Sequence, residues 1–316
     1  MTDFLTPREI AHRTNTARDA AVDVARDHGL TVTDATVLHD LFSVVVHLAP
    51  APVVARIPVV QPSEADRYLG AASQRAELAV SQWLTDRGVP VIPPSSHFPL
   101  EPVRRDGFSM TFWQYVEEDR AKEPDYEKNS EATADLHAAM RDYPGRLSFL
   151  SAAEPQFIIG ALTALQGRSD LIAPADLERA RQQWQVLAPM TRSRSAFEEV
   201  FPGIELQPVH GDCPAANIFP GVRGDLYADF ELVTLGPVEW DLAALGSELE
   251  FAYNRGARRN GMRTLDDAVM AFVNALGMLR VVATLSLVPQ LPVLLDYLKP
   301  SLDRWRAMPF TVRTTS

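Results

Sequence analysis

The sequence predicts an α+β chain with two parts, a small one built around antiparallel strands and a larger one that is mostly helical. Short β-rich runs bounded by turns and prolines fill residues 35–57. Apolar residues recur at helical spacing from residue 130 onward. A chain of 316 residues with 46% hydrophobic side chains is long enough to bury a core in each part.

Local signals predict the elements in order. Pro7 and Gly29 bracket a helix over residues 8–28. A β-meander follows, with strands at residues 35–39, 43–49 and 53–57. The later elements are expected as a helix at 71–86, strands at 108–116 and 226–228, and helices at 130–140, within 147–200, and at 238–253, 265–287 and 292–305.

Alternation along the third strand separates its side chains into two faces. Val54 and Arg56 share one face, and the remaining apolar side chains share the other. Arg56 is therefore either a functional cation inside the fold or an ordinary surface arginine on an edge strand.

The charge balance points away from nucleic acid as a partner. The formal net charge is -11 and the sequence pI is about 5.1, whereas nucleic-acid binding needs a basic face. An acidic surface tolerates, and can attract, a cationic small molecule. The same excess of acid also serves solubility alone.

The single cysteine and the lack of a signal segment predict a cytoplasmic protein. Cys213 has no cysteine with which to form an internal disulfide, which fits a reducing compartment. The N-terminal residues show no basic and apolar signal pattern. Prolines and polar residues interrupt the apolar run at 281–295, so no membrane span is expected. The oligomeric state is not predicted.

The densest chemistry lies between residues 209 and 242. The run HGDCPAAN, residues 210–217, sets Asp212 five residues before Asn217, which is the spacing of a phosphoryl-transfer loop. Asp212 can accept a proton from an attacking hydroxyl, and Asn217 can offer an amide oxygen to a divalent cation. A second carboxylate follows at Asp229, in the run DFE. The plain alternative is that these aspartates are helix caps or turn residues.

Cys213 lies inside this loop, close to His210, so a cysteine nucleophile is a second alternative. The spacing of Asp212 and Asn217 explains the loop without a thiol.

HGDxxxxN, DFE and the later GPxEWDLA together resemble the aminoglycoside phosphotransferase family of small-molecule kinases, distant relatives of the protein kinases. The resemblance implies a protein-kinase-like two-lobe fold, with a nucleotide-binding lobe at residues 1–116 and a catalytic lobe at 117–316. It also implies Mg²⁺, ATP or GTP as co-substrate, and transfer of the γ-phosphate to a hydroxyl of an aminoglycoside, amino sugar or amino alcohol.

The resemblance assigns roles around the loop. Asp212 is the implied catalytic residue, and Asn217 and Asp229 are the implied metal ligands. The implied supporting residues are His210, Glu231 and Asp241. His137, in the run LHAAM, is expected to be structural.

On the nucleotide side, Arg56 occupies the position of the lysine on the third strand of kinases. Glu77 is its implied ion-pair partner, with Glu64 and Asp66 as nearby alternatives. Trp113 and Tyr115 belong to a strand whose backbone is expected to bind a purine, or else they are simply core aromatics.

The expected phosphate loop, residues 39–43, contains no glycine. Ser43 offers the hydroxyl of this loop, and Val54 is an expected neighbour of the nucleotide. Asp40 would repel phosphate unless its side chain turned to solvent. This departure keeps open an alternative function, an inactive or weakly active kinase-like binding protein.

Acids in the C-terminal helices are candidates for binding a cationic acceptor. They are Glu248, Glu250 and Asp266. Each is more often an ordinary solvated helix residue.

Overall fold

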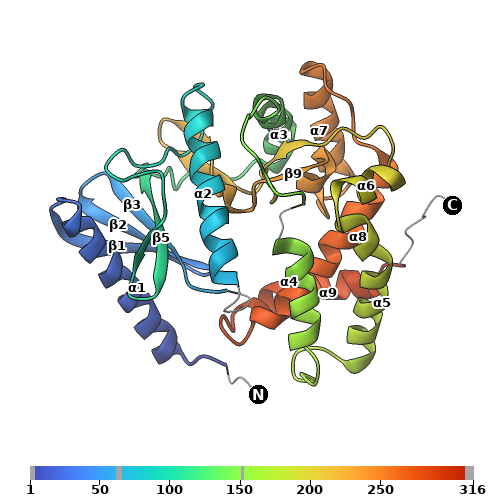
Figure 1. Cartoon of the computed structure of the whole chain (residues 1–316), viewed down its shortest axis with the longest axis horizontal. Helices are drawn as coiled ribbons and strands as arrows, with labels where there is room; N and C mark the ends of the chain where they lie inside the picture. The colour runs from blue at the N-terminus through green and yellow to red at the C-terminus, as the bar shows by residue number, and fades with distance from the viewer. Residues whose placement is uncertain (1–3, 62–65, 151–152, 310–316) are drawn as a thin grey trace. The chain divides into compact units, whose positions relative to one another are not determined.

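The computed structural model describes residues 4–61, 66–150 and 153–309 (Figure 1). The chain divides into two compact units. The first unit comprises Met1–Lys122, Phe219–Glu231 and Leu287–Pro292, and the second comprises Glu123–Ile218, Leu232–Ser286 and Val293–Ser316. Within the described residues the predicted α+β class is confirmed.

The first unit is built on a five-stranded antiparallel sheet in the order β1-β2-β3-β5-β4. Helix α1, Pro7–Asp27, packs against it, and helix α2 spans Asp66–Thr85. The strands are β1 Val32–Asp40, β2 Ser43–Pro50, β3 Val53–Pro58, β4 Val103–Arg105 and β5 Phe108–Gln114.

Helix α1 begins at a capping box. The Thr6 side chain accepts from the backbone N–H of Glu9, and the Glu9 carboxylate accepts from the backbone N–H of Thr6. Small and branched residues of α1, such as Ala17, Ala21 and Val24, are buried against the sheet in one hydrophobic cluster.

Strand β3 lies between β2 and β5, so Arg56 is not on an edge strand. Val53, Ala55 and Ile57 are fully buried, while Val54 and Arg56 are half-buried on the other face. This confirms the predicted alternation.

Two later segments complete the first unit. Strands β7, Ile218–Gly221, and β8, Gly224–Tyr227, form a hairpin that leads into the 3₁₀ turn η1, Phe230–Leu232. The segment Leu287–Pro292 is tied to the N-terminal residues by the Gln290 side chain, which exchanges two hydrogen bonds with the backbone of Gln61 (3.3 and 2.7 Å).

The second unit is mostly helical. Its helices are α3 Tyr126–Met140, α4 Ala153–Ala164, α5 Pro174–Thr191, α6 Arg194–Val200, α7 Ser247–Arg259, α8 Asp267–Thr284 and α9 Leu294–Ala307. Strand β6, Gln207–Val209, pairs with β9, Thr234–Gly236; the 3₁₀ helices η2, Val238–Leu242, and η3, Leu285–Leu287, follow later in the chain.

One predicted helix is wrong in extent. Residues 238–253 do not form a continuous helix, because η2 ends at Leu242 and α7 begins only at Ser247. Ala244 and Gly246 between them have φ of 63° and 97°, outside the helical region. Helices α2 and α3 also begin earlier than predicted, at Asp66 and Tyr126.

One described helical segment, Asp267–Leu287, is long and apolar enough to cross a membrane by length and composition alone. It was not the apolar run singled out in the sequence. Just over half of its apolar window (56%) is buried inside the fold, as expected for a core helix.

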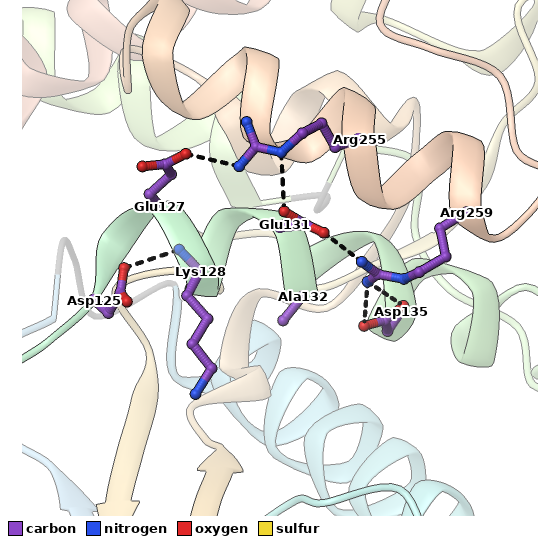
Figure 2. A pocket seen from close by; sticks show the side chains of 8 residues that line it. All are labelled: Asp125, Glu127, Lys128, Glu131, Ala132, Asp135, Arg255 and Arg259. Atoms are coloured by element: carbon purple, nitrogen blue, oxygen red, sulfur yellow. Dashed lines mark hydrogen bonds and ion pairs between the residues drawn. The ribbon is translucent and has the colours of Figure 1, made fainter.

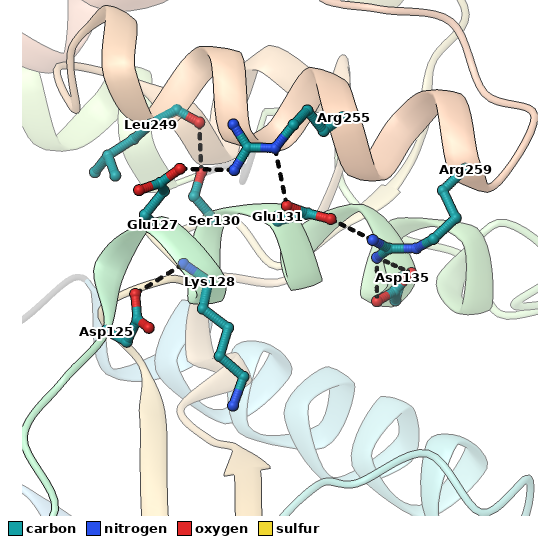
Figure 3. Close-up of polar contacts among 9 residues, drawn as sticks. All are labelled: Asp125, Glu127, Lys128, Ser130, Glu131, Asp135, Leu249, Arg255 and Arg259. Atoms are coloured by element: carbon teal, nitrogen blue, oxygen red, sulfur yellow. Dashed lines mark hydrogen bonds and ion pairs between the residues drawn. The ribbon is translucent and has the colours of Figure 1, made fainter.

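Helices α3 and α7 approach closely at Gly256. A Cβ there would lie 2.2 Å from the backbone oxygen of Glu131. Arg255 binds Glu127 (2.7 Å) and Glu131 (3.1 Å), so the two helices are joined by side chains as well as by backbone proximity (Figure 3).

Residues of α3 and α7, with Asp125 at the N-cap of α3, line an open pocket of about 430 Å³ (Figure 2). Arg259 of α7 forms ion pairs with Asp135 (2.9 Å) and with Glu131, both on α3. Because both arginines of the pocket are already neutralised by acids, its charges serve to hold α7 on α3.

Candidate functional site

The first unit gathers three of the predicted site residues around the guanidinium of a fourth, Arg56. Arg56 Nη1 donates to both carboxylate oxygens of Glu77, at 3.3 Å each. Arg56 Nη2 donates to Glu231 Oε2 at 2.6 Å and lies 2.8 Å from Asp229 Oδ1. Arg56 therefore faces three carboxylates, from α2 and from the DFE segment.

Electrostatics keeps this arginine charged. Burial lowers the pKa of the Arg56 guanidinium, but attraction from Glu231, Asp229 and Glu77 outweighs burial and raises the pKa above its ordinary value. Glu77 is 1% exposed, and burial raises its pKa to about 8 against the opposing effect of Arg56. Asp229 and Glu231 alone outnumber the single cation, so an excess of negative charge remains even when Glu77 is protonated.

Asp229 meets the requirements of a ligand for a divalent cation. Its Oδ1 is enclosed, yet it makes no aligned hydrogen bond to any residue that the structure describes. Its φ of 65° is unusual for a residue other than glycine and marks a strained backbone position. An enclosed carboxylate oxygen in a cluster with surplus negative charge suits Mg²⁺, which prefers oxygen ligands.

No group of three or more His, Cys, Asp or Glu side chains in the described part of the chain is arranged to hold a metal ion. Mg²⁺ commonly binds through one or two carboxylates together with substrate phosphates and water. The residues present fit that kind of site.

The face of the sheet that carries Arg56 also carries aromatic residues. Val54 pairs with Trp113 on β5 and with His47 on β2, so these side chains share the face. His47 stacks on Tyr115, with ring centroids 3.9 Å apart. Sequence reasoning missed His47, although its position opposite Val54 follows from the hairpin register.

Two backbone N–H groups of the segment expected to bind a purine are already occupied. The N–H of Gln114 donates to Pro93 O at 3.0 Å, and that of Tyr115 donates to Pro52 O at 2.9 Å. Trp113 is 8% exposed, and its ring N–H donates to Thr111. Purine binding by this segment remains a prediction, and the N–H groups of Gln114 and Tyr115 are not available for it.

The Asp40 side chain is turned toward helix α1 and is only partly exposed to solvent. Thr14 Oγ1 on α1 donates to Asp40 Oδ2 at 2.5 Å, and Arg13 Nη2 lies 4.0 Å from Asp40 Oδ1. Ser43 is buried at the start of β2. The glycine-free turn is therefore bonded to α1, where Arg13 offsets the negative charge of the Asp40 carboxylate.

In the second unit, the loop of residues 210–217 brings Asp212 and Asn217 together. Asn217 Nδ2 lies 3.5 Å from Asp212 Oδ2 and donates to Cys213 O at 3.1 Å. Gly211 has φ of 90°, and a Cβ there would lie 1.7 Å from Leu232 O. Only glycine fits this position, because both the backbone conformation and the space exclude a side chain.

Asp241 holds this loop in place through hydrogen bonds to its backbone. Its carboxylate accepts from the backbone N–H groups of His210 (2.8 Å) and Gly211 (2.7 Å). It also lies 2.8 Å from His137 Nε2, while His137 Nδ1 contacts the Tyr253 hydroxyl at 2.9 Å. All of these groups are buried, so the loop is held by a closed network.

Two further supports were not found in the sequence. Asn129 on α3 donates to Ala215 O at 3.0 Å and holds the far end of the loop. Glu239 is fully buried, forms two bonds with Arg263 (2.5 and 2.8 Å) and accepts from the backbone N–H of Asp266. Glu239 could have been suspected from its place in the run EWDLA, whereas no local pattern in the sequence indicates a role for Asn129.

Cys213 is unsuited to nucleophilic attack. Burial, with smaller contributions from the carboxylates of Asp212 and Asp241, raises the pKa of its thiol to about 11. The thiol is therefore neutral near pH 7.

Of the acids suggested for the acceptor, Asp266 has a structural position. It is the N-cap of α8 and accepts from the backbone N–H groups of Ala268 and Val269. Glu248 and Glu250 lie in the first turn of α7.

No protein-family model and no curated protein sequence matches this chain. Several solved structures are similar to it. Amicoumacin kinase in complex with AMP-PNP and Ca²⁺ is 16% identical, with a TM-score of 0.59 over 97% of this chain and 99% of the other. The wild-type aminoglycoside 2'-phosphotransferase-IIIa in complex with GDP is 13% identical, with a TM-score of 0.55 over 89% and 97%.

Choline kinase from Streptococcus pneumoniae is also similar, at 13% identity and a TM-score of 0.54 over 90% of this chain and 99% of the other. At such identities the likeness concerns the fold alone, and the predicted fold is confirmed. The chain has the α+β fold of the aminoglycoside phosphotransferases and related small-molecule kinases.

Proposed function

We propose that this chain is a nucleotide-dependent phosphotransferase that moves a γ-phosphoryl group to a hydroxyl of a small molecule. The observation that carries the proposal is the loop of residues 210–217, in which Asp212 and Asn217 are held side by side. Two backbone N–H groups of the loop are fixed on one buried carboxylate, that of Asp241. Such rigidity suits a group that must position a reacting hydroxyl.

In this proposal Asp212 orients the acceptor hydroxyl and takes its proton. Asn217 and Asp229 provide oxygen ligands for Mg²⁺, which when bound neutralises phosphate charge. Arg56, ion-paired with Glu77, holds the nucleotide phosphates through a guanidinium that stays charged inside the fold. Positioning and charge neutralisation supply most of the rate.

We further propose that the acceptor is a hydroxylated amine. The structural neighbours include complexes with kanamycin, spectinomycin and streptomycin and a choline kinase. The net charge of -11 on this chain favours a cationic acceptor.

The test is a screen of hydroxylated amines and sugars with ATP and GTP in the presence of Mg²⁺. Asp212→Asn should abolish phosphorylation of any acceptor found and leave nucleotide affinity within about twofold of the wild type. Asp19→Asn, an exposed carboxylate on α1, is the matched control and should behave as the wild type. Undiminished turnover by Asp212→Asn would refute the role of Asp212.

A second candidate is a kinase-like protein that binds nucleotide without turnover. The glycine-free turn at residues 39–43 favours it, because fewer backbone N–H groups can approach phosphate there. Stabilisation by ATP and Mg²⁺, with no transfer to any acceptor and no ATP hydrolysis, would identify this function.

A further inference from the structure

We infer that Glu231 is a positioning residue for Arg56, and that its carboxylate is not a metal ligand. The inference rests on the proposed function, because the role given to Glu231 is to hold the Arg56 guanidinium in the orientation in which it binds the nucleotide phosphates. All the residues concerned belong to the first unit.

The directional bonds of Arg56 divide between two glutamates. Nη1 donates to Glu77 at 3.3 Å, and Nη2 donates to Glu231 at 2.6 Å. The bond to Glu231 is the shorter one, and a charge-assisted bond of this length is strong. The guanidinium plane is thus fixed at both of its amino groups.

Asp229 is engaged differently. Its Oδ1 lies within ion-pair distance of the same Nη2, at 2.8 Å, but makes no aligned hydrogen bond with any described residue. The two carboxylates of the DFE segment therefore separate by geometry. Glu231 accepts a directional hydrogen bond from Arg56, whereas Asp229 is paired with Arg56 by charge alone, without a directional bond.

Helix α2 supports both partners of the arginine. Glu77 and Ser73 are four residues apart and lie on the same face of α2. The Ser73 hydroxyl donates to the backbone oxygen of Glu231. One helical face thus holds Glu77 directly and places Glu231 through its main chain.

This arrangement explains why arginine occupies the position of the kinase lysine. A guanidinium has donors at two ends of a rigid plane, so it can bridge Glu77 and Glu231. A lysine ammonium is a single point charge and cannot span both in one geometry. Arg56 and Glu231 are therefore a matched pair.

The first experiment tests the pair without nucleotide. Arg56→Lys, Glu231→Gln and the double variant are compared by Tm. The double variant should unfold within about 2 °C of the less stable single variant, because either change alone removes the same bond. Glu101→Gln, which breaks the exposed pair with Arg75, is the control and should add its small effect independently. Additive losses for Arg56→Lys and Glu231→Gln would overturn the pairing.

The second experiment measures nucleotide dissociation constants at several Mg²⁺ concentrations. Glu231→Gln should weaken binding about tenfold, or ~1.4 kcal/mol, without changing the Mg²⁺ concentration at half-saturation. In the Arg56→Lys background the same change should have less than about a twofold effect. A raised Mg²⁺ requirement in Glu231→Gln, or a full tenfold effect in the Arg56→Lys background, would overturn the inference and make Glu231 a metal ligand.

The two experiments fail separately. If the wild type binds no nucleotide, the proposed function fails, and with it the positioning role. The Tm comparison would still decide whether Arg56 and Glu231 are energetically coupled.

Discussion

Asp241→Asn should weaken the catalytic loop by a predictable amount. In the wild type, Oδ1 accepts from Gly211 N–H and Oδ2 accepts from His210 N–H, while His137 also contacts Oδ2. Asparagine has nearly the same shape but carries one acceptor oxygen and one NH₂ group. Whichever way the amide turns, its NH₂ meets a backbone N–H.

The magnitude follows from one lost charge-assisted bond and one buried donor left unsatisfied. The lost bond contributes about 1.5–3 kcal/mol and the unsatisfied donor about 1–3 kcal/mol; part of this cost is recovered by relaxation, so we expect a loss of about 3 kcal/mol in the free energy of unfolding. For a unit of this size that corresponds to a fall in Tm of about 6–12 °C. Because Asp212 follows Gly211 directly, kcat should fall about a hundredfold.

The assay is urea unfolding monitored by intrinsic fluorescence, together with steady-state kinetics on any acceptor identified. The matched control is Asp266→Asn. Asp266 also accepts from two backbone N–H groups, but at the more exposed N-cap of α8, where asparagine serves equally well. A loss below about 0.5 kcal/mol in Asp241→Asn, no larger than in the control, would refute the bracing role of Asp241.

Three further predictions concern other parts of the molecule. Asp229→Asn should remove the Mg²⁺-dependent part of the rise in Tm caused by ATP; an unchanged rise would contradict its role as metal ligand. Gly256→Ala should lower the free energy of unfolding by about 1–3 kcal/mol, because the added Cβ would clash with the backbone oxygen of Glu131. Gly160→Ala on α4 is the control and should not destabilise the protein, because the space around Gly160 is open. Equal effects of the two substitutions would contradict the close approach of α3 and α7. The pKa of the Cys213 thiol is raised from 9.0 to about 11, so at pH 8 iodoacetamide should alkylate it about a hundredfold more slowly than in the unfolded chain. The alkylation rate should rise with pH until the pH passes about 11. Equal rates for the folded and unfolded chains at pH 8 would show that the pKa of the thiol is not raised.

Local signals predicted the ends of α1 and the faces of β3 correctly. Thr6, Pro7 and Gly29 act within one or two turns of the helix, and side-chain alternation in Val53–Pro58 reports burial directly. Such features depend on neighbouring residues, so they can be read from the chain.

The break between η2 and α7 could not be predicted in this way. The apolar pattern continues through the break, and nothing about an alanine announces the positive φ found at Ala244. That conformation is imposed by tertiary contacts, including the bond from Ala244 N–H to Asn274 Oδ1 at 2.7 Å.

The residues of the candidate site were predicted by type and spacing, but their partners were not. The contact between His137 and Asp241 joins residues 104 positions apart, and the bond between Arg56 and Glu231 joins residues 175 positions apart. The orientation of Asp40 toward α1 likewise depends on Thr14, which lies on a different element. Composition and spacing carry no information on such pairings.

The segments Phe219–Glu231 and Leu287–Pro292, which belong to the first unit, have a consequence for biosynthesis. Strands β7 and β8, the carboxylates of Asp229 and Glu231, and the Gln290 side chain that bonds to Gln61 are all encoded far downstream of the five-stranded sheet. A ribosome that has finished Lys122 has therefore not yet produced what completes this unit. The N-terminal sheet therefore emerges first, with Arg56 unpaired with Glu231 until residue 231 has been made, and during that interval its exposed surface is open to chaperones that bind nascent chains.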